Sequence, residues 1–160
     1  PEAVRALGKV ALGERITPAL GGKGSRFDEG SLELEVELIS LGDGRFELEN
    51  KKSHLASMCG DFFDMGDCAM VRHAAMTICL TSNKTAPFDL GQWRSQGVAP
   101  ETLNVIVVKA AVAHKRAYDP ITARSFRVDT PGPCSSQLER YSYRHLSSGV
   151  NSLAFDQPSP

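Results

Sequence analysis

The stretch Ser31–Leu38, SLELEVEL, alternates apolar and acidic residues. Leucine or valine stands at every second position from Leu32 to Leu38, and glutamate stands at the positions between them. Because successive side chains of a β-strand point to opposite faces, the alternation predicts one strand with a buried face and a wet face. A sheet with one solvated face is commonly antiparallel, so we expect largely antiparallel pairing here.

The residues on either side of this stretch extend the same picture. Gly42–Gly44, GDG, predicts a hairpin turn, after which RFELE returns with Phe46 and Leu48 facing inward. Residues 1–13 place apolar side chains at helical spacing and predict a helix that ends at Gly13.

The second half of the chain mixes strand and helix patterns. Residues 61–82 read as two strands with a turn near Ala74, and residues 86–97 read as a short helix. Leu103–Val108, LNVIVV, is a largely β-branched run that predicts a fully buried strand. Residues 110–118 predict a short helix, which ends before Pro120.

Two further strands are predicted near the C-terminal end, at residues 125–130 and 140–146. Together the patterns predict a single α+β domain over residues 1–156, with a largely antiparallel or mixed β-sheet and a few short helices. Residues 157–160 are expected to form a loose tail.

Composition narrows the class of function. The chain has 160 residues, 41% of them hydrophobic and 23% charged, with a net charge of −1. It therefore lacks the basic excess typical of nucleic-acid or anionic-membrane binding. It also lacks an apolar run near the ~20 residues of a membrane span. We expect a soluble domain that binds neither nucleic acid nor membrane.

The cysteines are Cys59, Cys68, Cys79 and Cys134, and no two of them have Cys-x-x-Cys spacing. No histidine lies at zinc-finger spacing from them. The pattern predicts free thiols and hence a reducing, cytoplasmic compartment.

The strongest candidate for a binding site begins at the end of the LNVIVV run. Lys109 follows the predicted strand, and side chains at the carboxyl ends of strands often reach ligand crevices. His114 and Tyr118 are four residues apart and share a helix face, whereas Arg116 projects elsewhere. We expect Lys109, His114, Arg116 and Tyr118 to bind a substrate or a partner domain. A helix with a solvated polar face would explain the same residues without a binding role.

Other polar motifs favour structural interpretations. Gly21–Ser25, GGKGS, lacks the spacing of a phosphate-binding loop and predicts a turn. Asp61, Asp64 and Asp67 lack the spacing of a calcium loop and predict a solvated turn. No set of three or four zinc ligands can be assembled from residues such as His54, His73 and His145, so no metal site is expected in this chain. Cys134 with His114 as its base is the remaining nucleophile arrangement.

Five segments, taken in order, resemble the C-terminal domain of the MlrC family, which comprises microcystinase C and related zinc metallopeptidase-like proteins. The segments are PALGGK, LGDGRF, DMGDCAMVRH, residues 81–121 and residues 128–146. The third of these is similar to a Met-Gly-x-x-Ala-Val-Leu-Arg stretch of the family. Residues 81–121 are the most specific, since they follow the family order of Thr-Ser, Pro-Phe-Asp, a short helix, Val-Val-Lys and His-x-Arg-Ala before Pro-Ile. The resemblance extends over roughly residues 1–156.

Two positions depart from the family pattern. Ala110 stands where the family usually has Ser, and Lys115 stands where it usually has Phe. The first change removes a hydroxyl beside Lys109, and the second changes the packing around His114.

The resemblance implies that this chain is one half of a hydrolase. Family members hold zinc with Asp, His and Glu ligands in an N-terminal domain, which would precede Pro1. This chain would then need no cofactor of its own and would have no catalytic residue. It would shape the cleft for small peptides, such as linear microcystin-like substrates, and its partner would be its own N-terminal domain.

Two alternatives use the same sequence differently. The chain could be a binding or dimerisation module, a homo-oligomer without hydrolytic chemistry, pairing through the strand at Leu32–Leu38 or the one near Tyr141. It could also be a stand-alone enzyme that uses Cys134 and His114.

Overall fold

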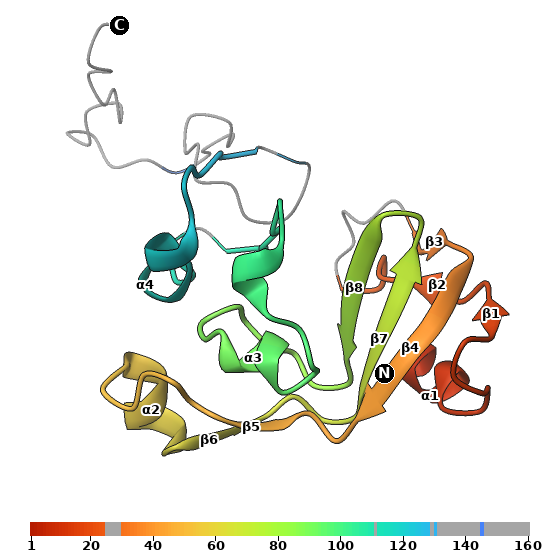
Figure 1. Cartoon of the computed structure of the whole chain (residues 1–160), viewed down its shortest axis with the longest axis horizontal. Helices are drawn as coiled ribbons and strands as arrows, with labels where there is room; N and C mark the ends of the chain where they lie inside the picture. Colours follow the sequence, from red (N-terminus) through yellow and green to blue (C-terminus); the bar gives the residue numbers. More distant parts are fainter. Residues whose placement is uncertain (25–29, 111, 129, 131–144, 146–160) are drawn as a thin grey trace, which may run out of the picture.

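The computed structural model describes residues 1–24, 30–110, 112–128, 130 and 145. These residues form a single small α+β domain whose main element is a four-stranded antiparallel sheet in the order β1-β4-β7-β8 (Figure 1). There are also two smaller two-stranded sheets, one of β2 (Ala19–Leu20) with β3 (Leu32–Glu33) and one of β5 (Arg45–Glu47) with β6 (Phe62–Asp64). The α+β fold expected from the sequence is confirmed.

The main sheet is built around two long central strands. β4 (Val36–Gly42) pairs with β1 (Arg15–Ile16) on one edge and with β7 (Cys68–His73) on the other. β7 pairs in turn with β8 (Met76–Thr81), through the turn near Ala74 that the sequence predicts. Ala74 adopts φ 49°, which is uncommon for a residue with a side chain.

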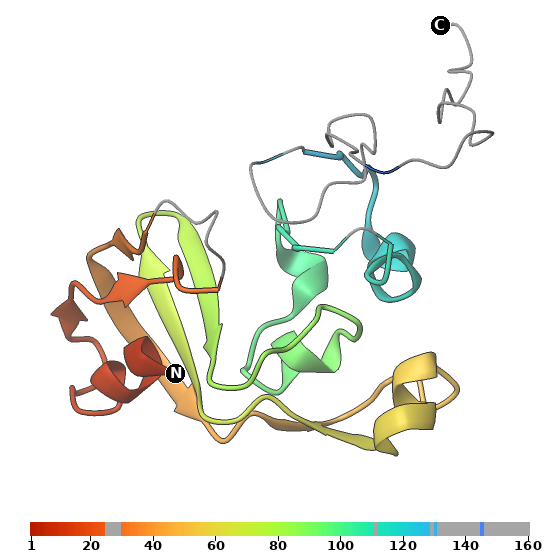
Figure 2. The same ribbon diagram turned by 180° about the vertical axis from the view of Figure 1, so that it is seen from behind.

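One face of this sheet forms the principal core. Helix α1 (Glu2–Leu7) places Val4 and Leu7 against β7 and β8, on the side drawn behind the sheet in Figure 1 and in front of it in Figure 2. The buried side chains that meet there are Val4, Leu7, Val36, Leu38, Ala69 and Val71. Leu38 pairs with Val71 across the ladder, and both are fully buried.

A ribbon of two crossing segments carries the chain from this sheet to the opposite end of the molecule (Figure 1). There β5 (Arg45–Glu47) pairs with β6 (Phe62–Asp64), and α2 (His54–Cys59) lies between them in sequence. Gly44 and Gly66 lie in contact where the segments cross, because a Cβ on Gly44 would come within 2.1 Å of the Gly66 carbonyl oxygen. Phe46, Leu48, Ala56, Met65 and Cys68 form a second core.

The remaining elements are short helices. α3 (Gly91–Arg94) is followed by the 3-10 helix η1 (Pro100–Thr102), and α4 (Lys115–Tyr118) runs directly into η2 (Asp119–Ile121). α3 packs closely on β5, since a Cβ on Gly91 would lie 2.7 Å from the Phe46 ring. The expected short helix in residues 86–97 is therefore confirmed, with Gly97 at φ 77° beyond its end.

The SLELEVEL stretch forms two short strands rather than one. Its C-terminal part enters β4 with Val36 and Leu38 buried, whereas β3 (Leu32–Glu33) pairs with β2 (Ala19–Leu20) and leaves Leu32 61% exposed. The chain changes partner between the two strands, so the predicted alternation of buried and exposed side chains holds only from Leu34 onward.

The predicted hairpin at Gly42–Gly44 is wrong. β7 pairs with β4 from Glu37 to Gly42, and β1 pairs with it at Val36 and Glu37, whereas β5 is part of another sheet. It pairs with β6 instead. Phe46 and Leu48 are nevertheless buried, as the alternation in RFELE predicts.

The helix predicted for residues 1–13 ends earlier, at Leu7. The backbone of Gly13 donates to the carbonyl of Leu38, and the N–H of Leu38 donates to the carbonyl of Glu14. This stretch therefore lies along the edge of β4, and a helix could not continue to Gly13 and make these bonds.

The buried strand predicted at Leu103–Val108 is also wrong. No strand is assigned there, and Val105 and Val107 are 77% and 88% exposed. A β-branched run forms a buried strand only where a neighbouring strand pairs with it, and none of the described residues does so. The strand predicted from residue 125 likewise has no strand assignment over residues 125–128.

Candidate functional site

Helices α3 and α4 meet at one hydrogen bond between aromatic side chains. The indole N–H of Trp93 donates to the hydroxyl oxygen of Tyr118 across 2.9 Å. Tyr118 is only 4% exposed, and burial raises the pKa of its phenol. At neutral pH the phenol is therefore neutral, and it anchors α4 to α3.

A cavity of about 140 Å³ lies beside this bond. The segment after β6, strand β8, the loop after β8, α3 and α4 supply its lining, which is Met65, Cys79, Thr81, Thr85, Pro87, Gln92, Trp93 and Tyr118. The hydroxyls of Thr81 and Thr85 both donate to the carbonyl of Asn83, and the Gln92 amide donates to the carbonyl of Ala86. These hydrogen bonds fix the shape of the wall.

The Cys79 thiol in the wall of this cavity is protonated at neutral pH. Burial raises the pKa of Cys79 to about 11. Burial is also the main cause that raises the pKa of nearby Cys68 to about 12. Since the thiolate is the nucleophilic form of cysteine, neither residue is an activated nucleophile.

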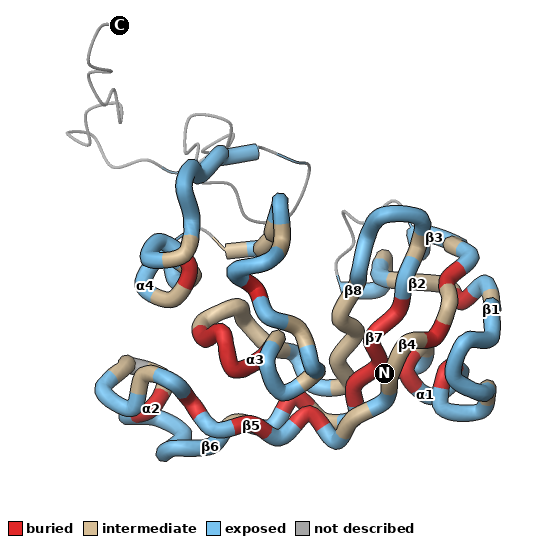
Figure 3. Tube along the Cα trace, viewed as in Figure 1, coloured by how far each residue is buried: buried red, intermediate tan, exposed pale blue. Residues whose placement is uncertain are grey.

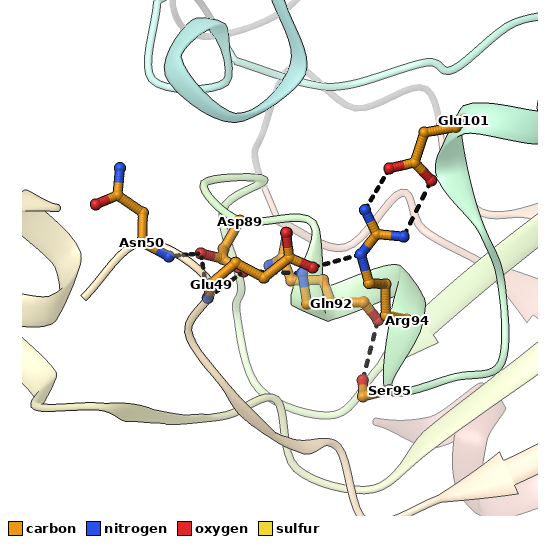
Figure 4. Close-up of polar contacts among 8 residues, drawn as sticks. Glu49, Asn50, Asp89, Gln92, Arg94, Ser95 and Glu101 are labelled. Carbon is orange, nitrogen blue, oxygen red and sulfur yellow. Dashed lines mark hydrogen bonds and ion pairs between the residues drawn. The ribbon is translucent and has the colours of Figure 1, made fainter. Parts of the chain in front are cut away.

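Just before α3, the carboxylate of Asp89 fixes the chain between β5 and α2 (Figure 4). Asp89 is 3% exposed and accepts hydrogen bonds from the backbone N–H groups of Glu49, Asn50 and Gly91. The bond from Gly91 satisfies an N–H at the start of α3, where helical partners are missing. A buried carboxylate with several N–H partners is thus a structural anchor between segments about 40 residues apart.

Arg94 extends this network to η1, which lies just before the exposed residues Val105 and Val107 (Figure 4). Its guanidinium binds Glu49 through Nε and forms a two-pronged pair with Glu101. The hydrogen bonds to Glu101 and Glu49 raise the pKa of Arg94, and Arg94 lowers the pKa of Glu101. The pair fixes η1, and therefore the point at which the Val105 stretch leaves the domain.

The predicted binding residues occupy different environments. Lys109 and Arg116 are exposed, His114 is half-buried, and Tyr118 is buried. His114 and Tyr118 do lie on one face of α4, with ring centroids 6.5 Å apart. The Nδ1 atom of His114 is buried and has no hydrogen-bond partner among the described residues. The binding role of the four residues remains a prediction.

The described residues contain no cluster of three or more His, Cys, Asp or Glu side chains that could hold a metal ion. The ring of His73 contacts the Glu35 carbonyl at 2.8 Å, beside the Arg15–Glu37 ion pair. Asp61, Asp64 and Asp67 are exposed. Cys59, Cys68 and Cys79 are free thiols. Cys134 lies outside the described residues. The predicted strand near Tyr141 and the predicted tail lie outside them as well.

Asp89, Trp93 and Arg94 carry the polar framework of this region, and the sequence reasoning did not single them out. Asp89 had a local signal, because a carboxylate just before a short helix commonly caps it. Trp93 and Arg94 had none, since their partners Tyr118 and Glu49 lie 25 and 45 residues away in sequence.

A family model described as MlrC C-terminus matches residues 1–145. The chain belongs to this family. The match covers most of the stretch over which the motifs indicate a resemblance, and it includes the Asp89 anchor and the Lys109–Tyr118 segment. No curated protein matches this MlrC C-terminal chain.

A crystal structure of a protein from Mesorhizobium sp. BNC1, provisionally described as a metallopeptidase, has the same fold. The two share 27% sequence identity with a TM-score of 0.70 over 82% of the present chain. The matched region is only 25% of the Mesorhizobium chain. The MlrC C-terminal chain thus spans about a quarter of the length of this relative.

None of the helices in the described part of the chain is both long and apolar enough to cross a membrane.

Proposed function

We propose that this chain is the C-terminal accessory domain of a zinc-dependent metallopeptidase or amidohydrolase that acts on small peptides. The family match over residues 1–145 carries the proposal, and the similarity to a longer protein described as a metallopeptidase supports it. In this proposal an N-terminal domain holds the zinc. A zinc ion supplies Lewis-acid polarisation of a carbonyl and an activated water.

The role of this chain is to complete the cleft. Lys109, His114 and Arg116 present two cations and an imidazole from the segment around α4, which suits the carbonyl and carboxylate groups of a peptide. Tyr118 serves from inside the domain, because its hydrogen bond with Trp93 fixes the orientation of α4. Substrates such as linear microcystin-like peptides would fit this proposal.

Metal analysis tests whether the N-terminal domain, rather than this chain, binds the zinc. After dialysis, the full-length protein should hold about one equivalent of zinc and the 160-residue chain none. Only the full-length protein should hydrolyse peptides. A full-length protein with neither zinc nor hydrolysis would overturn the proposal, and stoichiometric zinc in the 160-residue chain would overturn the assignment of the metal to the N-terminal domain.

The substrate-facing role has its own test. Lys109→Ala in the full-length enzyme should lower kcat/KM about 10–100-fold, which corresponds to the loss of one charge-assisted contact. Lys9→Ala is the matched control, since Lys9 is an exposed lysine that follows α1. Equal kinetics for the two variants would contradict a role for Lys109.

A binding or dimerisation module without hydrolytic chemistry is the second candidate. The exposed valines at Val105 and Val107 favour it, since an exposed apolar patch marks an interaction surface. Light scattering separates this candidate from the first. A hydrolytically inactive full-length protein that forms a stable dimer would support it, and a strict monomer at high concentration would contradict it.

A further inference from the structure

The segments on either side of α4 contain several large apolar side chains that are exposed to solvent. Val105, Val107 and Val112 precede α4 and are 77%, 88% and 64% exposed. Phe126 and Val128 follow η2 and are 76% and 80% exposed. The segment after α4 and η2 is accordingly coloured as exposed in Figure 3. Scattered exposed apolar residues are ordinary, but five within 24 residues point to an interaction surface.

The exposure also alternates along the first segment. Val105, Val107 and Lys109 are exposed, whereas Ile106, Val108 and Ala110 are half-buried. This alternation, in a run of β-branched residues, is the pattern of a strand that has one side covered. No backbone hydrogen bond joins residues 104–110 to another described residue, so the strand that the sequence favours has no partner within this part of the chain.

The order of the segments fits two parallel strands. Residues 104–109 and 124–128 are separated by a connection that contains α4 and η2, and parallel strands need a crossover of about a dozen residues or more. Parallel strands are usually covered on both faces, which agrees with apolar residues on the exposed side of each segment.

Charge indicates what lies opposite. Residues 105–128 contain five Lys or Arg and one Asp, although the whole chain has a net charge of −1. Arg124 lies over the Phe126 ring, 6.0 Å from its centroid, so one of these cations lies directly beside an exposed apolar side chain. Segments that expose both apolar and basic side chains fit a partner surface that is apolar with acidic residues beside it.

We propose that residues 104–109 and 124–128 add to an open sheet edge, with an acidic rim, in the preceding part of the longer protein. This inference rests on the proposed function, which places that part beside this domain. The matched region is a quarter of the Mesorhizobium relative, so three quarters of a chain of that length is available to supply the edge. The added strands place Lys109 at the boundary between the two parts of the protein.

Hydrogen exchange of the full-length protein and of the 160-residue chain tests the inference. Amides in residues 104–109 and 124–128 should exchange about 100-fold more slowly in the full-length protein, at every protein concentration. Amides of β7 should exchange equally slowly in both and so report that the domain is folded. Equal exchange in residues 104–109 would overturn the inference.

A pair of variants sharpens this test. Val107→Asp in the full-length protein should restore fast exchange at residues 104–109 and leave β7 protected. Leu12→Asp is the matched control, because Leu12 is also a largely exposed apolar residue, at 65%, yet lies in another region. If the amides of residues 104–109 stay protected in Val107→Asp as they do in Leu12→Asp, the inference is overturned.

Other occupants give different results, and each would overturn the proposal. Protection that rises with protein concentration together with a dimer mass would identify a second copy. Protection that appears only when a single-stranded DNA oligonucleotide is added would identify a nucleic-acid surface. Zinc content and peptide hydrolysis are measured on the same preparation, so a protected but inactive protein refutes only the proposed function, whereas an active but unprotected one refutes only this docking.

Discussion

Strand β7 and the stretch Val105–Val108 are both apolar runs, yet they lie in opposite environments. β7 lies between β4 and β8, and Ala69 and Val71 are fully buried in the core that α1 covers. Val107 is 88% exposed. The comparison teaches that an apolar run specifies a strand only when the chain also supplies both an edge partner and a covering layer. β7 has both in this chain, whereas the second stretch has no strand partner among the described residues and is half-buried on one side alone.

The largest expected effect tests this contrast directly. Leu38→Ala removes a fully buried side chain between α1 and β7 and should lower the free energy of unfolding by about 3 kcal/mol. Val107→Ala in the same 160-residue chain should change it by less than about 0.5 kcal/mol. Urea denaturation measures both. Similar losses for the two variants would show that Val107 already has a packing partner within the chain.

The second prediction concerns Asp89, which connects the segment after β5 with the start of α3. Asp89→Ala leaves the N–H groups of Glu49, Asn50 and Gly91, of which the last is buried, without their acceptor and should cost about 2–3 kcal/mol. Asp43→Ala is the control, since Asp43 is exposed and accepts one N–H bond, from Arg45. Its cost should be below about 0.5 kcal/mol. Thermal denaturation of both variants, with equal shifts in Tm, would refute the anchoring role of Asp89.

The smallest effect is a pH dependence of the free energy of unfolding, which arises from Cys68 in the second core. Burial raises the pKa of Cys68 to about 12 in the folded protein, whereas an unfolded thiol ionises near pH 8.5. The unfolded state therefore loses its proton first, so stability is fully present below about pH 8.5 and falls as the pH rises toward 12. Between pH 8 and pH 10 the thiol should contribute about 2 kcal/mol of this loss.

Chemical denaturation under reducing conditions at both pH values measures the effect. Cys68→Ala should flatten the loss, and Cys59→Ala, at an exposed position, should not. A decline that is unchanged in Cys68→Ala would show that Cys68 does not carry the pH dependence.

The sequence predicted the local features whose causes lie within a few residues. The turn at Ala74, the short helix before Gly97 and the inward Phe46 and Leu48 all follow from local spacing. The hairpin at Gly42–Gly44 failed, because the choice of partner for β4 depends on β1 and β7, which lie elsewhere in the sequence.

The same distinction separates the parts of the candidate site. The placement of His114 and Tyr118 on one helix face follows from their spacing, and the structure shows it. The bond between Trp93 and Tyr118 and the anchor at Asp89 join residues 25 and 40 positions apart. A single sequence holds no local signal for such pairs, because each partner alone is an ordinary polar or aromatic residue.

The close crossing at Gly44 and Gly66 determines where this chain can change in length. The N–H of Met65 donates to the carbonyl of Gly44, and Asp89 holds Glu49 and Asn50 in place. Residues 51–60 then form the outer end of a stem whose base is fixed on both sides. A change in length confined to the exposed residues Lys51 and Lys52 would leave the register of β4 against β7 intact, whereas one within α2 would also move Ala56 out of the second core.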